Sequence, residues 1–112
     1  MSAAVDLEAL RSAVRSGRIR WRQHALERML ERGILRNDIR GVILEGEMIE
    51  EYPKAEPYPS GLFHAVVRGR PLHAVAAFDG SVSGLAYIIT AYEPDELHFE
   101  ADLKTRRRAT HE

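Results

Sequence analysis

The first half of the chain carries apolar residues at helical spacing. Residues 5–16 place apolar side chains three or four positions apart and are followed by Gly17, which predicts a first helix. Residues 21–31 repeat this spacing and are followed by Gly33, which predicts a second helix. The apolar side chains that the second helix would bury are Ala25, Leu26, Met29 and Leu30.

The second half of the chain changes to the shorter period of strands. Before that change, Asn37 or Asp38 can cap a third helix that runs to about residue 45 and ends at Gly46. Alternating segments separated by turns rich in proline and glycine follow. They predict strands at residues 47–52, 62–68, 72–78 and 85–92. Residues 93–95 end the last strand and can start a short helix.

This order, helices first and strands afterwards, predicts an α+β domain. We expect the N-terminal helices to pack on one face of a roughly four-stranded antiparallel sheet, because the turns are short and crossover helices are absent. Residues 18–21 form either a short link or an edge strand. Strict alternation in the last strand places Ala86, Ile88, Thr90 and Tyr92 on one side of the sheet.

The composition is that of one compact domain spanning residues 1–112. With 45% hydrophobic residues, a chain of 112 residues can bury a core without disulfides or a metal. It contains no cysteine, which excludes disulfides, thiolate metal ligands and a cysteine nucleophile. The N-terminus lacks a signal-peptide pattern, and no apolar stretch is long enough to span a bilayer. The sequence therefore predicts a cytoplasmic protein of bacterial type with no membrane contact.

Charge is segregated along the chain, although its formal net charge is only -1. Residues 11–40 hold nine arginines against three acidic residues, and residues 41–60 hold five glutamates against one lysine. A basic surface can therefore attract a polyanion such as RNA. Two alternatives stay open. The arginines are solvated surface residues, or the acidic block meets the basic helix of a second copy in a homodimer.

Three residues of the second helix give the strongest indication of chemistry. His24, Arg28 and Arg32 are spaced four apart, so on a helix they form a stripe at the border of its apolar side. Histidine titrates near neutrality and arginine forks onto phosphate oxygens, so this stripe suits proton transfer beside a phosphate. We expect the stripe to be partly buried near His73 or Tyr92. The alternative is that His24 is structural and Arg28 pairs with a glutamate three residues later.

An ordered set of short motifs resembles a known family. The motifs are His24-Ala-x-x-Arg28-x-x-x-Arg32-Gly-Ile34, Gly46-Glu47-x-Ile49, Tyr52-Pro53, Pro59-Ser60, Arg70-Pro-Leu-His73 and Ile88-Ile-Thr90-x-Tyr92-x-Pro94. Over roughly residues 20–108, this set resembles the small bacterial and archaeal proteins catalogued as domain of unknown function 4258. Their layout is more distantly similar to the RelE, barnase and colicin group of ribonuclease toxins, in which helices also precede an antiparallel sheet.

The resemblance to that toxin group implies cleavage of RNA by the ribose 2′-hydroxyl without a metal or other cofactor. Such a reaction needs a base, an acid and cations that stabilise the phosphorane charge. His24 suits proton transfer, while Arg28 and Arg32 suit charge stabilisation. The candidates for a second proton-transfer group in the sheet are His73, Tyr92 and His64. In the basic C-terminal tail, Arg106 and Arg107 would bind RNA phosphates.

Other interpretations stay open from sequence alone. His73 lies in an apolar strand, where a buried, hydrogen-bonded imidazole is as consistent as a catalytic one, and Tyr92 can be a core ring. His64 and His73 could meet across a hairpin, but no third ligand is evident, so metal binding is not expected. His98 and His111 carry no spacing signal. The rival to a ribonuclease toxin with an antitoxin partner is a non-catalytic module that binds RNA or an acidic protein segment.

Overall fold

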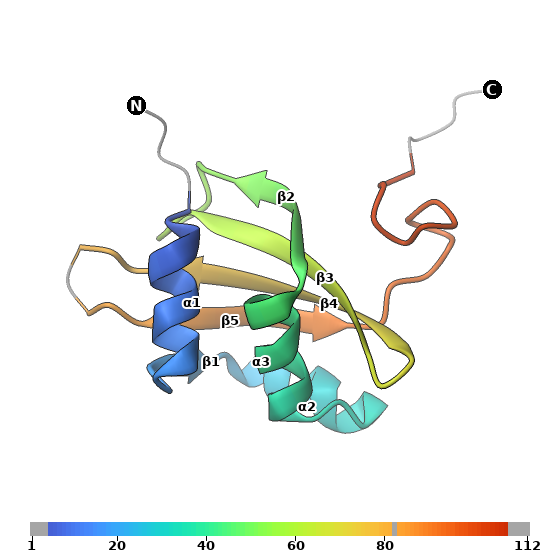
Figure 1. The fold of residues 1–112 in the computed structure, drawn as a ribbon, viewed down its shortest axis with the longest axis horizontal. Helices are drawn as coiled ribbons and strands as arrows, with labels where there is room; N and C mark the ends of the chain where they lie inside the picture. The colour runs from blue at the N-terminus through green and yellow to red at the C-terminus, as the bar shows by residue number, and fades with distance from the viewer. Residues whose placement is uncertain (1–4, 82, 108–112) are drawn as a thin grey trace.

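The computed structural model describes residues 5–81 and 83–107, whose fold is shown in Figure 1. Arg108 of the basic tail and His111 lie outside these residues. The elements of the described part are α1 (Leu7–Arg15), β1 (Ile19–Trp21), α2 (Gln23–Arg32), α3 (Arg36–Glu45), β2 (Glu47–Tyr52), β3 (Ser60–Val67), β4 (Arg70–Phe78) and β5 (Ala86–Tyr92). This order confirms the α+β class. Among these residues, no helix has the length and apolar character needed to cross a membrane.

Local capping explains where the helices begin and end. The carboxylate of Asp6 accepts a hydrogen bond of 3.1 Å from a backbone N–H in the first turn of α1. Gly33 ends α2 in the left-handed conformation, with φ at 67°. α3 begins earlier than predicted, and Asp38, in its first turn, accepts from the backbone N–H of Leu35 at 2.9 Å. Asp38 therefore binds the backbone N–H of the N-cap residue, Leu35, from within the first turn of α3. The prediction that Asn37 or Asp38 is itself the N-cap was wrong.

The sheet has five strands in the order β1-β5-β4-β3-β2. The last four strands of the chain pair antiparallel, whereas β1 pairs parallel with β5, with Arg20 beside Tyr87. The predicted four-stranded antiparallel sheet was therefore wrong, and the sheet is mixed. Three residues are too few to show alternation, and the partner of β1 lies at the other end of the chain. Residues 18–21 were thus ambiguous from sequence.

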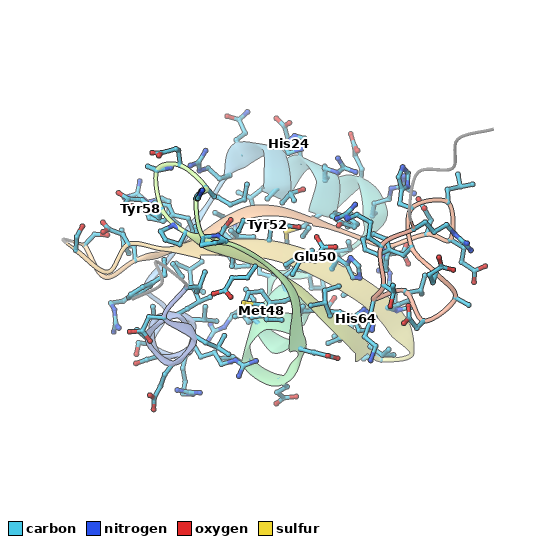
Figure 2. All side chains as sticks on the ribbon, turned by 90° about the horizontal axis from the view of Figure 1, so that it is seen from above. His24, Met48, Glu50, Tyr52, Tyr58 and His64 are labelled. Atoms are coloured by element: carbon cyan, nitrogen blue, oxygen red, sulfur yellow. The ribbon has the colours of Figure 1, made fainter. Side chains whose placement is uncertain are left out.

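One face of the sheet is covered by α1 and α3, while α2 lies on the other side, along the edge beside β5 (Figure 2). β1 pairs only with the first half of β5, and α2 packs beside the remainder. From α2 only Ala25 and Met29 are buried, whereas Leu30 is 84% exposed. The expectation that the N-terminal helices share one face, with Leu30 buried, was therefore wrong for α2.

A β-bulge in β5 changes which side chains share a face. The register between β4 and β5 shifts between Ile88 and Thr90, so Ile89 is an extra residue. Ile88 and Ala91 both lie in the core under the helices. Thr90 and Tyr92 therefore lie on the opposite side, which we call the open face. The predicted grouping of Ile88 with Thr90 and Tyr92 was wrong because the bulge shifts the alternation.

The C-terminal segment, residues 93–107, folds back over part of the open face. Phe99 is only 2% exposed, and its ring meets the ring of His73 edge-on, with 4.6 Å between centroids. The backbone carbonyl of Leu103 also hydrogen-bonds to His73. The described residues of this segment form turns and one isolated β-bridge, so the short helix predicted after residues 93–95 is not formed.

Candidate functional site

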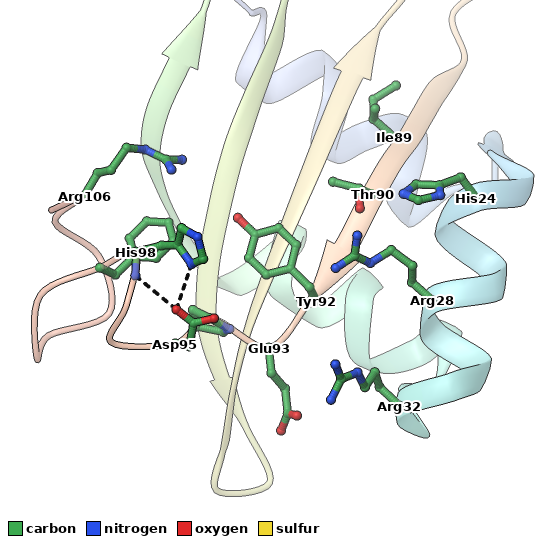
Figure 3. A pocket seen from close by; sticks show the side chains of 12 residues that line it. His24, Arg28, Arg32, Ile89, Thr90, Tyr92, Glu93, Asp95, His98 and Arg106 are labelled. Atoms are coloured by element: carbon green, nitrogen blue, oxygen red, sulfur yellow. Dashed lines mark hydrogen bonds and ion pairs between the residues drawn. The ribbon is translucent and has the colours of Figure 1, made fainter. Parts of the chain in front are cut away.

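A cavity of about 780 Å³ opens between α2, the end of β5 and the C-terminal segment (Figure 3). Its polar lining side chains are His24, Arg28, Arg32, Thr90, Tyr92, Glu93, Asp95, His98 and Arg106. The lining therefore combines three arginines and two histidines with two carboxylates. Glu93 is engaged by Arg70 at 2.7 Å, a hydrogen bond that lowers the pKa of Glu93. The charge that remains at the cavity favours an anionic ligand.

The stripe of His24, Arg28 and Arg32 forms one wall of this cavity (Figure 3). All three side chains are exposed, so the expected partial burial is not found. The wall does share the cavity with Tyr92, one of its two predicted neighbours. Within residues 5–81 and 83–107, the side chains of Arg28 and Arg32 make no hydrogen bond or ion pair, and Arg28 does not pair with Glu31. Both guanidiniums are available to a ligand.

His73 is fully buried behind Tyr92 and is not among the side chains that line the cavity. Its Nε2 lies 2.7 Å from the carbonyl oxygen of Leu103, which can only accept, so Nε2 carries the proton. Nδ1, 3.3 Å from the hydroxyl of Tyr92, is then the acceptor. Burial, partly opposed by the bond to Leu103, lowers the pKa of His73 to about 4. His73 is therefore neutral at pH 7, and it positions Tyr92.

Tyr92 connects His73 to the cavity. Burial raises the pKa of Tyr92, so its phenol stays protonated at neutral pH. Because the hydroxyl donates its proton to His73, the phenolic oxygen can accept a hydrogen bond from a ligand hydroxyl. Tyr92 is thus suited to hold a hydroxyl group in place, and it is unsuited to act as a base near neutral pH.

His98, which sequence reasoning missed, lines the cavity across from His24 (Figure 3). Its Nδ1 lies 2.9 Å from Oδ1 of Asp95, and this bond lowers the pKa of the Asp95 carboxyl. A carboxylate that holds one ring nitrogen leaves Nε2 for proton exchange with a ligand. The spacing of Asp95 and His98 does not distinguish this pair in the sequence, because the two residues reach the cavity only when the C-terminal segment folds back to it.

The two arginines predicted to bind RNA phosphates lie in different places. Arg106 lines the cavity, but it donates from Nε and Nη2 to Glu50 at 3.0 and 3.2 Å, and its guanidinium lies over the ring of Phe99. Burial alone would raise the pKa of Glu50, yet its hydrogen bonds, first of all that from Arg106, lower it and keep the pair charged. Arg107 is not part of the lining and pairs with Glu100 at 3.1 Å.

His64 lies apart from the cavity, on the open face beside His73. The two rings meet edge-on with 5.2 Å between centroids, and Nδ1 of His64 is buried without a hydrogen-bond partner among the described residues. Burial, with the nearby charge of Lys104, lowers the pKa of His64. Lys104 in turn pairs with Glu47 at 3.2 Å. No group of three or more His, Cys, Asp or Glu side chains in the described ranges is arranged to hold a metal ion.

The comparisons with known proteins give one match. No curated protein and no solved structure matches the chain significantly, so a similarity to the RelE and barnase group is not confirmed. The sequence model of one family, described as "Domain of unknown function (DUF4258)", matches residues 21–93. This range is more than half of the chain, and it includes the stripe on α2 and Tyr92 on β5. The chain therefore belongs to the DUF4258 family.

Proposed function

We propose that the cavity is the active site of a metal-independent ribonuclease that cleaves RNA through attack by the ribose 2′-hydroxyl. One observation carries the proposal. Arg28 and Arg32 lack ion-pair partners in the described part of the chain and share a wall of the cavity with an exposed histidine. An arginine is always charged, and its guanidinium can bind two phosphate oxygens at once. A phosphodiester is therefore the anion that this wall fits best.

Each step of the reaction has a side chain in the lining. Tyr92, which lines the cavity between α2 and the C-terminal segment, would contact the ribose and leave the single proton of the 2′-hydroxyl to the base. His24 and His98, on facing walls, would supply the base that removes the 2′ proton and the acid that protonates the leaving 5′ oxygen. Arg28 and Arg32 would stabilise the negative charge of the phosphorane. The products would be a 2′,3′-cyclic phosphate and a free 5′-hydroxyl.

The layout of helices before antiparallel strands supports a toxin of the RelE and barnase type, which would act in the cytoplasm. A toxin needs a partner that blocks its site. An acidic segment of an antitoxin protein would complement Arg28 and Arg32, whose side chains form no ion pair among the described residues.

The proposal is tested by incubating mixed RNA with the purified protein in the presence of a chelator. Wild type is compared with His24→Ala and Arg28→Ala, and Arg15→Ala serves as the matched control because Arg15 is equally exposed but lies on α1. We expect cleavage with 2′,3′-cyclic ends by wild type and control, and a loss of about a hundredfold or more in the other two variants. Equal cleavage by all four proteins would disprove the assignment.

Binding without cleavage is the second candidate function. The observation that favours it is the state of His73, one of the three candidates for a second proton-transfer group in the sheet. It is buried and neutral and does not line the cavity. If His98 also fails in this role, the cavity retains only phosphate binding. Salt-dependent RNA binding that is lost in Arg28→Ala, with intact RNA in every reaction, would establish this candidate instead.

A further inference from the structure

Beyond the cavity, the open face carries a pair of stacked tyrosines. The rings of Tyr58 and Tyr87 lie 5.3 Å apart between centroids, with 18° between their planes. Tyr87 is on β5, and Tyr58 is on the loop between β2 and β3. Both are only half-buried, and Figure 2 shows Tyr58 on the side of the sheet away from α1 and α3.

This tyrosine pair lies within reach of a ligand held in the cavity. Thr90, which lines the cavity, follows Tyr87 by three residues on the same strand. At about 3.3 Å per residue, the two positions are roughly 10 Å apart. A nucleotide one or two positions from the bound phosphate can therefore reach the rings. The C-terminal segment leaves them uncovered in the described contacts, since it packs on His73 at the other end of this face.

Cationic side chains connect the two places along the edge of the sheet. Arg20 on β1 is the register partner of Tyr87 in the parallel pair, so both point to the same face. Arg20 and Arg22 are exposed, and neither side chain has an ion pair within residues 5–81 and 83–107. The chain then enters α2 and reaches His24 two residues later. Positive charge thus lies beside Tyr87 and continues at the exposed Arg22 before the chain reaches the cavity wall, whereas the carboxylate of Asp79 lies beside Tyr58.

We propose, on the basis of the proposed function, that Tyr58 and Tyr87 form a base-stacking platform beside the cavity and that the substrate is single-stranded RNA. Aromatic rings next to a cationic track are the arrangement that binds single strands, because the rings take the bases and the cations take the phosphates. Bases in a duplex are stacked on each other and cannot reach the rings. The platform therefore selects unpaired RNA without reading its sequence through hydrogen bonds.

The experiment measures binding by fluorescence anisotropy with a labelled single-stranded RNA of about ten nucleotides, 2′-O-methylated throughout so that it cannot be cleaved. Tyr87→Leu removes the stacking ring but keeps an apolar side chain, and Tyr87→Phe keeps the ring. We expect Tyr87→Leu to weaken binding roughly tenfold, Tyr87→Phe to bind like wild type, and duplex RNA to bind more weakly than the single strand.

A second set of RNAs separates stacking from general damage to the fold. Each RNA carries one abasic position, and the position is moved along the strand. We expect one abasic position to weaken binding to wild type as much as Tyr87→Leu does, and to have no further effect on that variant. Equal sensitivity of both proteins to every abasic position, or tight binding by Tyr87→Leu, overturns the platform.

Two further outcomes separate this inference from the ribonuclease proposal. Position-dependent coupling to Tyr87 without cleavage of unmodified RNA supports the platform and overturns the ribonuclease. Cleavage of unmodified RNA without such coupling overturns the platform alone. If the single strand does not bind and unmodified RNA is not cleaved, both are overturned.

Discussion

Lowering the pH from 7 to 5 should destabilise the fold, because His73 takes up a proton more readily in the unfolded chain than in the native structure. His73 is fully buried and its pKa is lowered to about 4, whereas an unfolded chain holds the same group near its ordinary value of 6.5. Between these two values the unfolded state binds a proton that the native state does not, so the free energy of unfolding falls as the pH falls. Above pH 6.5 this contribution to stability is complete, and below about pH 4 no more is lost.

The size of the effect follows from the two pKa values. At pH 5, preferential protonation of the unfolded state lowers the free energy of unfolding by about 2 kcal/mol, and at pH 7 the effect is close to zero. His73→Gln keeps a side-chain N–H that can donate to the carbonyl of Leu103, but it removes the titrating group. The variant should therefore lose about 2 kcal/mol less than wild type between pH 7 and pH 5.

Urea unfolding followed by circular dichroism at both pH values measures this difference. His24→Gln is the matched control, because it makes the same substitution at an exposed histidine. A comparison within each protein cancels any general loss of stability caused by the substitution. If His73→Gln loses as much stability as wild type and the control, His73 is not the buried neutral group that holds the C-terminal segment.

Three other predictions address the backbone, the cavity and the C-terminal segment. Gly46→Ala should lower the free energy of unfolding by more than about 2 kcal/mol in urea titrations, since its new Cβ would press on two backbone carbonyl oxygens. Gly41 lies in the interior of α3 with open space around it, so Gly41→Ala should raise the free energy of unfolding by about 0.5–1 kcal/mol. Arg32→Ala should reduce the slope of log affinity for single-stranded RNA against log salt by about 0.7, while Arg15→Ala should not change it. Glu50→Gln should cost about 1 kcal/mol in thermal unfolding because it weakens the pair that anchors the C-terminal segment.

Much of the secondary structure could be predicted because it is encoded by neighbouring residues. The apolar period and the left-handed Gly33 define α2 locally, and alternation defines the four long strands. The position of α2 was not predictable in the same way. It packs at an edge of the sheet, where a narrow strip with Ala25 and Met29 is enough to bury it, so Leu30 is left exposed despite its regular spacing.

In the candidate site too, the residues placed by local spacing could be predicted and those placed by long-range folding could not. The spacing of His24, Arg28 and Arg32 depends only on the helix, and the structure brings this stripe to the cavity lined by Tyr92. His98 escaped prediction because its place depends on how residues 93–107 fold back, which no local pattern encodes. The burial of His73 likewise depends on that segment, whose Phe99 and Leu103 cover the ring.

Only one of the two walls of the cavity lies within the residues that the family model matches. The match to DUF4258 covers residues 21–93, so the wall with His24 and Arg28, together with Tyr92, lies inside it, whereas Asp95 and His98 lie beyond its end. Chemistry that rests on the matched part must therefore work from the α2 wall. The C-terminal segment completes the cavity from outside the match and buries His73, which holds Tyr92 in place. His24→Ala and Arg28→Ala consequently decide whether the matched domain acts on phosphodiesters, and His98→Ala decides whether the second proton comes from the C-terminal segment.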